Sequence, residues 1–342
     1  MLSLAMPGAS PAAQPLGPVQ PATGPGGADW PHAGFVQKEF GSYEERTLLF
    51  EPVGPRPASA PVVIFLHGWV TADPAFHAGW IEHLCRRGWV VIYPLYQGTG
   101  EHSSRYTINA IRSVKEAFRR LYAETDLQPD RERVAVIGHE VGAVMAANLA
   151  AAARYFKLPV PKVVMVLHPS RHANAGAGLN TGLELYDLSG IAPGTLLMTV
   201  VGDEDPDSYE LAREMFYIAD NLPTRDKAFV TFLSDLRGKP PLVADRHAVL
   251  SPKEPRYERE IERRRFEYLQ TFRARRLSRW TRCRGLDAMD WYGTFRLFDG
   301  LCDVAFRGGP RAPVLEDTDA GRFMGVWSDG VPVKGLLTTH RP

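Results

Sequence analysis

The chain has 342 residues, with 40 Lys and Arg against 39 Asp and Glu, which gives a formal net charge of +1. Hydrophobic residues make up 44% and charged residues 23%, close to the average of globular domains and enough for a large core. This balance argues against a dedicated nucleic-acid binder, no apolar run is long enough to span a membrane, and three cysteines permit at most one intrachain bridge.

The first segment, residues 1–34, differs in composition from the rest. It holds seven prolines and six glycines, and no charged residue precedes Asp29. Such a segment buries too little apolar surface to offset its ordering entropy, so we expect it to be disordered or to lie on the domain as an extended arm. Its small residues resemble those near an export-signal cleavage site, but a basic start and a full apolar stretch are missing. A secreted or periplasmic location and a cytoplasmic one therefore both stay open.

Residues 35–250 alternate between two patterns and form the expected core. Apolar, β-branched runs typical of buried parallel strands occur at 61–66, 89–93, 133–138, 162–167, 195–201 and 229–233. Helical spacing of apolar residues occurs at 75–87, 108–122 and 141–155. Strands alternating with helices predict an α/β fold with a mostly parallel, doubly wound sheet. In such sheets the chemistry lies at the carboxyl ends of the strands.

Residues 251–342 are expected to form a helical and extended addition packed on this core. Arg256–Arg284 contains eleven arginines, which suits either an RNA or phosphate surface or the solvated face of a helix. Four glutamates among them favour the solvated helix. A second helical pattern at Asp287–Phe306 is rich in aromatic residues and is expected to pack against the core.

Chemistry-bearing residues follow four of the predicted strands. In chain order they are His67-Gly68-Trp69, Gly138-His139-Glu140-Val141-Gly142, Gly202-Asp203-Glu204-Asp205 and, beyond the last strand, Val243–His247. Their order and spacing resemble the oxyanion loop, nucleophile elbow, acid and histidine of the α/β-hydrolase superfamily. The chain is similar to its uncapped dienelactone-hydrolase-like and polyester-hydrolase-like branch over most of residues 35–250. The resemblance implies an α/β-hydrolase fold without a large cap, carrying a C-terminal helical extension.

The resemblance assigns roles to the residues of the elbow. Gly138 and Gly142 flank a sharp turn where larger residues would clash, and His139 lies on it. The backbone N–H groups of Val141 and Trp69 would form an oxyanion hole. The Trp69 ring would line the pocket, or alternatively belong to the core.

The acid and the base follow from the same resemblance. His247 would be the general base and Asp205 would orient its imidazole, with Asp203 as the alternative acid. His168 and His172 lie near another strand end and could line the pocket, but two histidines without a third ligand are weak evidence for a metal. We therefore expect no metal and no cofactor, and a small molecule as substrate or ligand.

One departure from the family pattern outweighs these matches. The elbow pattern Gly-x-Ser-x-Gly has Glu140 at its centre, and no serine lies on that turn. A glutamate should be ionised at neutral pH, would favour the imidazolium form of His247, and would repel the oxyanion. Both effects oppose ester hydrolysis of the serine type.

Three hypotheses follow. The first is a hydrolase of carboxylic-ester-like molecules with Glu140 as an unusual nucleophile or water-activating base, which would become an ordinary serine esterase if Glu140 replaced a natural serine. The second is a catalytically inactive homologue that binds a ligand in the cleft. The third is a carboxylate-nucleophile enzyme of the dehalogenase or epoxide-hydrolase type. The third is weakened because glutamate is one methylene longer than the aspartate of those relatives and residues 168–194 are too few for their cap.

Overall fold

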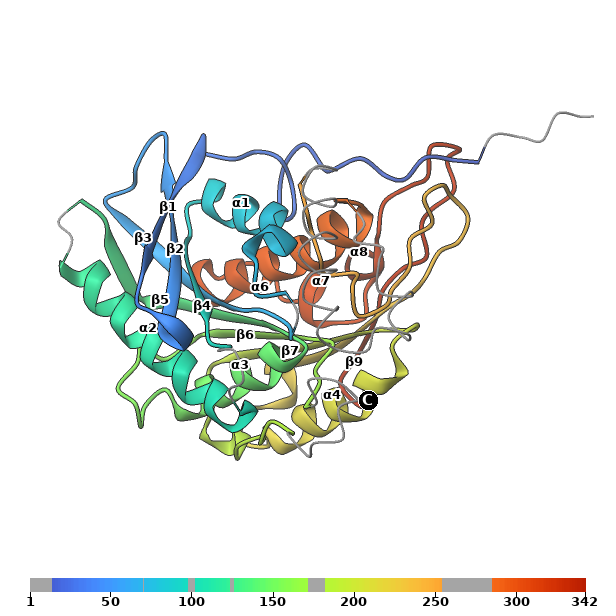
Figure 1. Cartoon of the computed structure of the whole chain (residues 1–342). Helices are drawn as coiled ribbons and strands as arrows, with labels where there is room; N and C mark the ends of the chain where they lie inside the picture. The colour runs from blue at the N-terminus through green and yellow to red at the C-terminus, as the bar shows by residue number, and fades with distance from the viewer. Residues whose placement is uncertain (1–13, 70, 98–101, 124–125, 172–181, 254–284) are drawn as a thin grey trace, which may run out of the picture.

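The computed structural model describes residues 14–69, 71–97, 102–123, 126–171, 182–253 and 285–342 (Figure 1). The expectations for Arg256–Arg284, His172 and Cys283 fall outside these residues.

A central sheet organises the described residues. Its strands lie in the order β1-β2-β4-β3-β5-β6-β7-β8-β9. Their bounds are β1 Gly34–Phe40, β2 Arg46–Val53, β3 Ser59–Leu66, β4 Val90–Leu95, β5 Gln128–His139, β6 Val163–Leu167, β7 Leu196–Gly202, β8 Lys227–Phe232 and β9 Leu337–Thr339. Strands β3 to β8 pair in parallel, which confirms the predicted mostly parallel sheet.

Both edges of the sheet are antiparallel. β1 pairs with β2 and β2 with β4 at one edge, and β9 pairs with β8 at the other. β1, β2 and β9 were not predicted from the sequence. β9 has only three residues, and β1 alternates partly exposed and exposed positions without a continuous apolar run.

Helices cover both faces of the sheet (Figure 1). Their bounds are α1 Ala78–Arg86, α2 Tyr106–Ala123, α3 Val141–Ala152, α4 Pro206–Ile218, α6 Arg296–Arg307, α7 Ala312–Leu315 and α8 Asp319–Arg322. α2, α3 and α4 lie below the sheet in this view, and α1 and α6 lie above it. The three predicted helices at 75–87, 108–122 and 141–155 correspond to α1, α2 and α3, and α4 was not anticipated.

The core divides between these two faces because strand side chains alternate. Along β3, Val62 and Ile64 join the cluster that includes residues of α2 and α3, whereas Val63 and Phe65 join the cluster with α1 and α6. A buried strand between two helical layers must be apolar on both sides, which explains its continuous hydrophobic run.

The C-terminal addition completes the second layer, as expected from its aromatic residues. A π-helical stretch, Met289–Phe295, leads directly into α6. The Phe295 ring stacks on Trp80 of α1 at 5.7 Å between centroids, and Phe298 meets the same ring edge-on. In the described part of the chain, no helix has both the length and the apolar character needed to cross a bilayer.

The described part of the N-terminal arm, residues 14–34, is tied to this layer. The Gly26 N–H donates to Oδ2 of Asp299 at 2.8 Å, and the Trp30 indole N–H donates to Nδ1 of His83 at 3.1 Å. The Arg86 guanidinium lies 3.7 Å from the centre of the Trp30 ring. These contacts hold the arm against α1 and α6.

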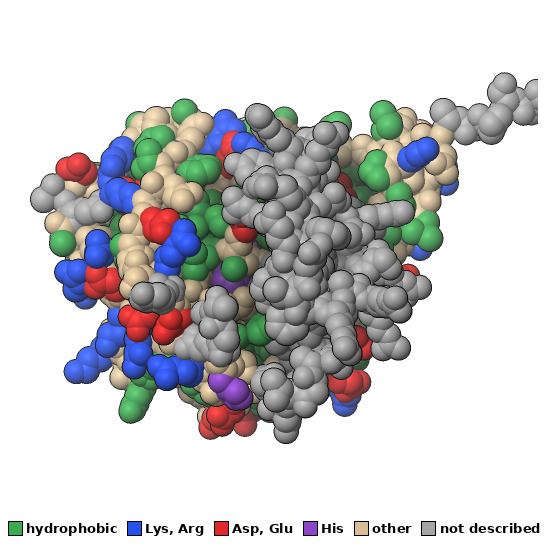
Figure 2. Space-filling model, in the orientation of Figure 1, with side chains coloured by type: hydrophobic (Ala, Val, Ile, Leu, Met, Phe, Trp, Pro, Cys, Tyr) green, Lys and Arg blue, Asp and Glu red, His purple; other side chains and the backbone are tan. Residues whose placement is uncertain are grey.

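Charged side chains of both signs lie on the visible surface, in agreement with the formal net charge of +1. Figure 2 shows blue and red side chains interspersed over the left part of the visible face.

Cys85 and Cys302 are both buried free thiols, and burial raises the pKa of each well above its usual range.

Candidate functional site

The turn between β5 and α3 has the geometry of a nucleophile elbow. Its central residue, Glu140, has φ 51° and ψ −117°, a conformation that residues with a side chain rarely adopt. A Cβ on Gly138 would lie 2.1 Å from the Gly142 carbonyl oxygen, and a Cβ on Gly142 would lie 2.1 Å from that of Leu66. Glycine is therefore required at both positions because α3 begins so close to β5 and β3.

The Glu140 side chain turns back toward the loop after β3. Its Oε2 accepts a hydrogen bond from the Trp69 N–H at 3.1 Å, and the side chain is buried at 5% exposure. A Cβ on Gly68 would lie 2.7 Å from the same oxygen, so glycine at 68 leaves room for the carboxylate. The Thr71 hydroxyl fixes this loop by accepting from the Gly68 N–H at 2.8 Å. The N–H expected to bind a substrate oxyanion thus holds a carboxylate of the protein itself.

Two other predicted residues border this turn. Val141 is the first residue of α3 and is buried, so its backbone lies at the helix N-terminus as expected. The Trp69 ring is partly buried and lies 5.8 Å from the Tyr106 ring, and it packs against the apolar core below the sheet.

Asp205 lies between β7 and α4, at the position expected for the acid. Its Oδ2 accepts from Nδ1 of His168 at 3.0 Å and from the Ser208 hydroxyl, and its Oδ1 accepts from Arg246 at 2.8 Å. Burial acts to raise the pKa of this carboxyl, but the hydrogen bond and charge of His168, the Ser208 hydroxyl and Arg246 outweigh it and leave the pKa lowered. Asp205 is a buried carboxylate that orients an imidazole.

The imidazole against Asp205 is that of His168, whereas the sequence analysis expected His247. His168 follows β6, is fully buried, and has a positive φ of 46°. Its ring lies 6.4 Å from that of His139, edge to face. His168 and Asp205 are 37 residues apart in the sequence. The only sequence signal for His168 was its position near the end of a predicted strand.

His247 lies on the loop after β8 and takes a local partner. Its N–H donates to Oδ1 of Asp245 at 2.9 Å, and its Nδ1 lies 3.7 Å from that oxygen. The preceding residue, Arg246, joins this loop to the elbow, because its carbonyl oxygen lies 2.7 Å from Nε2 of His139. Asp203, the alternative acid, instead accepts from the N–H and hydroxyl of Ser234 and anchors the strand ends.

The electrostatic surroundings of Glu140 combine neutral imidazoles with one guanidinium. Burial lowers the pKa of His67 to about 4, although its bond to Gly68 and the charge of Glu140 act in the opposite direction. Burial lowers the pKa of His77 and His139 well below the usual value, helped by neighbouring histidines. Burial also acts against the charge of Arg246, but Asp205 and Glu140 outweigh it and raise its pKa. Within the described ranges, no three side chains of a kind that binds metals converge on one point.

A model of the α/β-hydrolase fold family matches residues 63–244, which is more than half of the chain and runs from within β3 into the loop after β8. No curated protein matches.

Solved structures with a similar fold include several esterases. One is an esterase of the bacterial hormone-sensitive lipase family, at 19% identity over 69% of this chain and 84% of that one, with a TM-score of 0.47. Another is a fungal esterase from Rhizomucor miehei, at 14% identity over 72% and 87%, with a TM-score of 0.46. A thermostable esterase from Pseudomonas putida matches at 19% identity over 56% and 72%, with a TM-score of 0.41. By the family match over residues 63–244, the chain belongs to the α/β-hydrolase fold family.

Proposed function

We propose that this protein binds carboxylic-ester-like small molecules at its α/β-hydrolase site and that Glu140 prevents it from hydrolysing them by acyl transfer. The observation that carries the proposal is the 3.1 Å hydrogen bond from the Trp69 N–H to Oε2 of Glu140. In this proposal, the carboxylate takes the position in which an ester carbonyl would develop negative charge.

The chemistry of ester hydrolysis explains why this position matters. An oxyanion hole accelerates acyl transfer because its N–H donors are strongest where charge appears in the transition state. A carboxylate already bound there occupies the donor and repels the second negative charge. Attack by the carboxylate on an ester would in addition have to form a mixed anhydride and expel an alkoxide, which is uphill. The Asp205–His168 pair is buried, and in this proposal it supports the fold of the ligand site instead of taking part in proton transfer.

The test compares the parent chain with Glu140→Ser and Glu140→Gln on short-chain nitrophenyl esters. We expect the parent to bind the ester saturably in ligand-observed NMR without turnover. We expect Glu140→Ser, which vacates the hole and supplies a hydroxyl, to gain turnover and to react with a serine-directed phosphonate probe. Glu210→Gln on α4, whose side chain is exposed, is the matched control and should behave like the parent. Turnover by the parent that Glu140→Gln abolishes would overturn the proposal and make Glu140 catalytic.

A second candidate is hydrolysis at a saturated carbon, as in an alkyl halide or an epoxide. It is favoured by the same hydrogen bond, because the N–H holds only one of the two carboxylate oxygens. Oε1 would attack the carbon and displace halide, or open the epoxide with protonation of its oxygen, to give an ester of Glu140. Water would then attack the carbonyl carbon of that ester, whose Oε2 stays on the Trp69 N–H, and a histidine would take the proton of the water. The bond from the carbonyl carbon to Oε1 would break, and the alcohol would leave with Oε1 and that proton, which regenerates the carboxylate.

Isotope labelling distinguishes this candidate. In a single turnover in H₂¹⁸O, the mechanism transfers a glutamate oxygen to the alcohol product and leaves solvent oxygen in Glu140. Mass spectrometry of the peptide containing Glu140 would then show a gain of about two mass units. An unlabelled peptide together with no alcohol product would exclude it.

A further inference from the structure

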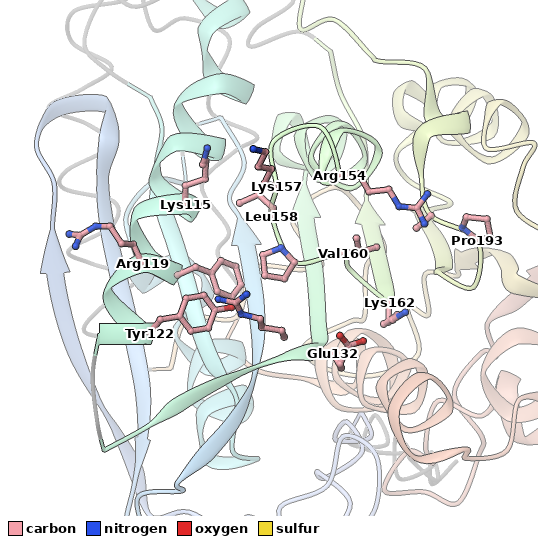
Figure 3. Close-up of a pocket in the computed structure, with 14 residues that line it drawn as sticks. Lys115, Arg119, Tyr122, Glu132, Arg154, Lys157, Leu158, Val160, Lys162 and Pro193 are labelled. Atoms are coloured by element: carbon pink, nitrogen blue, oxygen red, sulfur yellow. The ribbon is translucent and has the colours of Figure 1, made fainter.

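A concave site lies at the amino ends of the parallel strands, whereas the elbow lies at their carboxyl ends. Its cavity volume is 610 Å³, within the size range of small-molecule sites. It is lined by the C-terminal half of α2, the start of β5, the α3–β6 connection and the loop before β7 (Figure 3). The end of β5, from Val134 to His139, separates it from Glu140 of the elbow by on the order of 20 Å.

The shape of this pocket follows from an irregularity in the sheet. β3 and β5 pair in register from Val62 and Val134 onward, but the preceding partners are Ala60 and Pro129. β5 therefore carries extra residues at this point, which bulge out of the ladder. Two of them, Arg131 and Glu132, line the pocket.

The lining is dominated by cations. Six of its fourteen residues are basic and Glu132 is its single acid: the basic residues are Lys115, Arg119, Arg131, Arg154, Lys157 and Lys162. Figure 3 shows that the labelled basic side chains come from several different segments around a set of apolar residues: Lys115, Arg119, Arg154, Lys157 and Lys162. Charges of one sign that converge from separate segments onto one concavity raise the local concentration of anions.

The carboxylates beside the pocket neutralise only part of this charge. Glu116 binds Arg119 and Arg120, and these hydrogen bonds lower its pKa to about 2. Asp130 binds Arg133 at 2.6 Å. Among the described residues, no ion pair involves Lys115, Arg154, Lys157 or Lys162. Four cations of the lining therefore have no carboxylate counterpart in the described part of the fold.

Cations near helix C-termini are common because they interact favourably with the helix dipole, and this explains part of the cluster. α2 ends at Ala123 and α3 at Ala152, so Arg119 and Arg154 have such a reason to be there. It does not explain Arg131 on the β5 bulge or Lys162 just before β6. The positive charge of the pocket lining therefore exceeds what favourable interaction with the two helix dipoles explains.

The floor of the pocket is apolar and partly aromatic. Phe118 and Tyr122 stack at 5.9 Å with an interplanar angle of 24°, and the Arg131 guanidinium lies 3.9 Å from the centre of the Tyr122 ring. Leu158, Pro159 and Val160 form the facing wall. A flat apolar group could pack there while its charged part meets the cations at the rim.

We propose that this pocket binds a phosphorylated small molecule that carries a flat apolar or aromatic part. Lysine and arginine bind phosphate oxygens through charge-assisted hydrogen bonds, and several phosphate charges match four unpaired cations better than a single carboxylate does. The proposal does not depend on the function of the elbow site.

The experiment measures binding of three probes to the full chain by isothermal titration calorimetry: ATP, inorganic pyrophosphate and adenosine. We expect ATP to bind most tightly, pyrophosphate more weakly and adenosine least. We expect ATP binding to weaken when NaCl is raised from 50 to 300 mM, because exposed ion pairs are screened by salt.

Two double variants test the location: Lys115→Gln with Lys157→Gln, and Arg154→Gln with Lys162→Gln. Each exposed ion pair contributes up to about 1 kcal/mol, so each double variant should weaken ATP binding by about tenfold. The matched control removes two exposed cations elsewhere, Arg213→Gln on α4 with Arg225→Gln before β8, and should bind ATP within about twofold of the parent. Unchanged urea midpoints show that each variant is folded.

Three results would overturn the proposal. The first is that neither ATP nor pyrophosphate binds the parent. The second is that the pocket variants and the control lose affinity equally, which would indicate a general charge effect. The third is that pyrophosphate binds as tightly as ATP, which would remove the role of the apolar floor.

Discussion

Replacing Gly142 by alanine tests the elbow without altering any reactive group. An added Cβ would lie 2.1 Å from the carbonyl oxygen of Leu66 and 2.4 Å from that of His67. Carbon and oxygen approach one another to about 3.3 Å at closest, so the start of α3 and the end of β3 must separate by about 1 Å. The position of the added Cβ is fixed by the backbone of residue 142, and its neighbours are backbone carbonyl oxygens. No side chain can therefore rotate away to make room.

The expected cost is at the upper end of the range for overpacking, about 3 kcal/mol. For a chain of 342 residues, whose unfolding entropy near Tm is about 0.7 kcal/mol/K, that corresponds to a decrease in Tm of roughly 4 °C. Because Leu66 leads into the loop that carries Trp69, we also expect faster hydrogen exchange at the Trp69 amide, whose bond to Glu140 is displaced.

The assay is a urea titration with a thermal melt, and Gly34→Ala is the control. Gly34 opens β1, and its added Cβ meets nothing within 4 Å, so this variant should stay within about 0.5 kcal/mol of the parent. A Gly142→Ala variant as stable as Gly34→Ala, with unchanged exchange at Trp69, would refute the close approach of α3 to β3.

Three further predictions concern buried ionisable side chains. His67 has a pKa lowered to about 4, below the unfolded value of about 6.5, so the stability linked to its neutral form is complete above pH 6.5 and is lost as the pH falls toward 4; urea titrations across this range should show a decrease of up to roughly 3 kcal/mol that His67→Asn reduces. Asp205 has a lowered pKa, so it stabilises the fold above the unfolded value near 4 and loses this effect progressively as the pH falls from there through its own lowered pKa; Asp205→Asn should therefore destabilise more at pH 6 than at pH 2, and equal losses at both would contradict its pairing with His168. Asp299→Ala leaves His83 and the Gly26 N–H without their buried acceptor, and it should cost about 3 kcal/mol and hasten proteolytic release of the N-terminal arm, with arm release at the parental rate as the contrary outcome.

Much of the fold could be predicted from the sequence, because its signals are local. A run such as residues 61–66 is apolar at every position only if both of its faces are covered, which identifies a buried parallel strand and its helical layers. Gly138 and Gly142 around Glu140 indicated a tight turn, since the steric requirement acts between close neighbours in sequence. The short edge strand β9 carried no comparable pattern, because pairing partners distant in the chain decide its structure.

The tertiary structure decided what the local signals left open. The sequence determined that a glutamate occupies the elbow, whereas only the fold directs its Oε2 to the Trp69 N–H, 71 residues away. Likewise, the order of motifs in the sequence predicted His247 as the partner of Asp205, whereas the fold places His168 against it. A hydrogen bond depends on distances of a few tenths of an ångström between groups that the chain brings together only after it folds, and no spacing in the sequence encodes that distance.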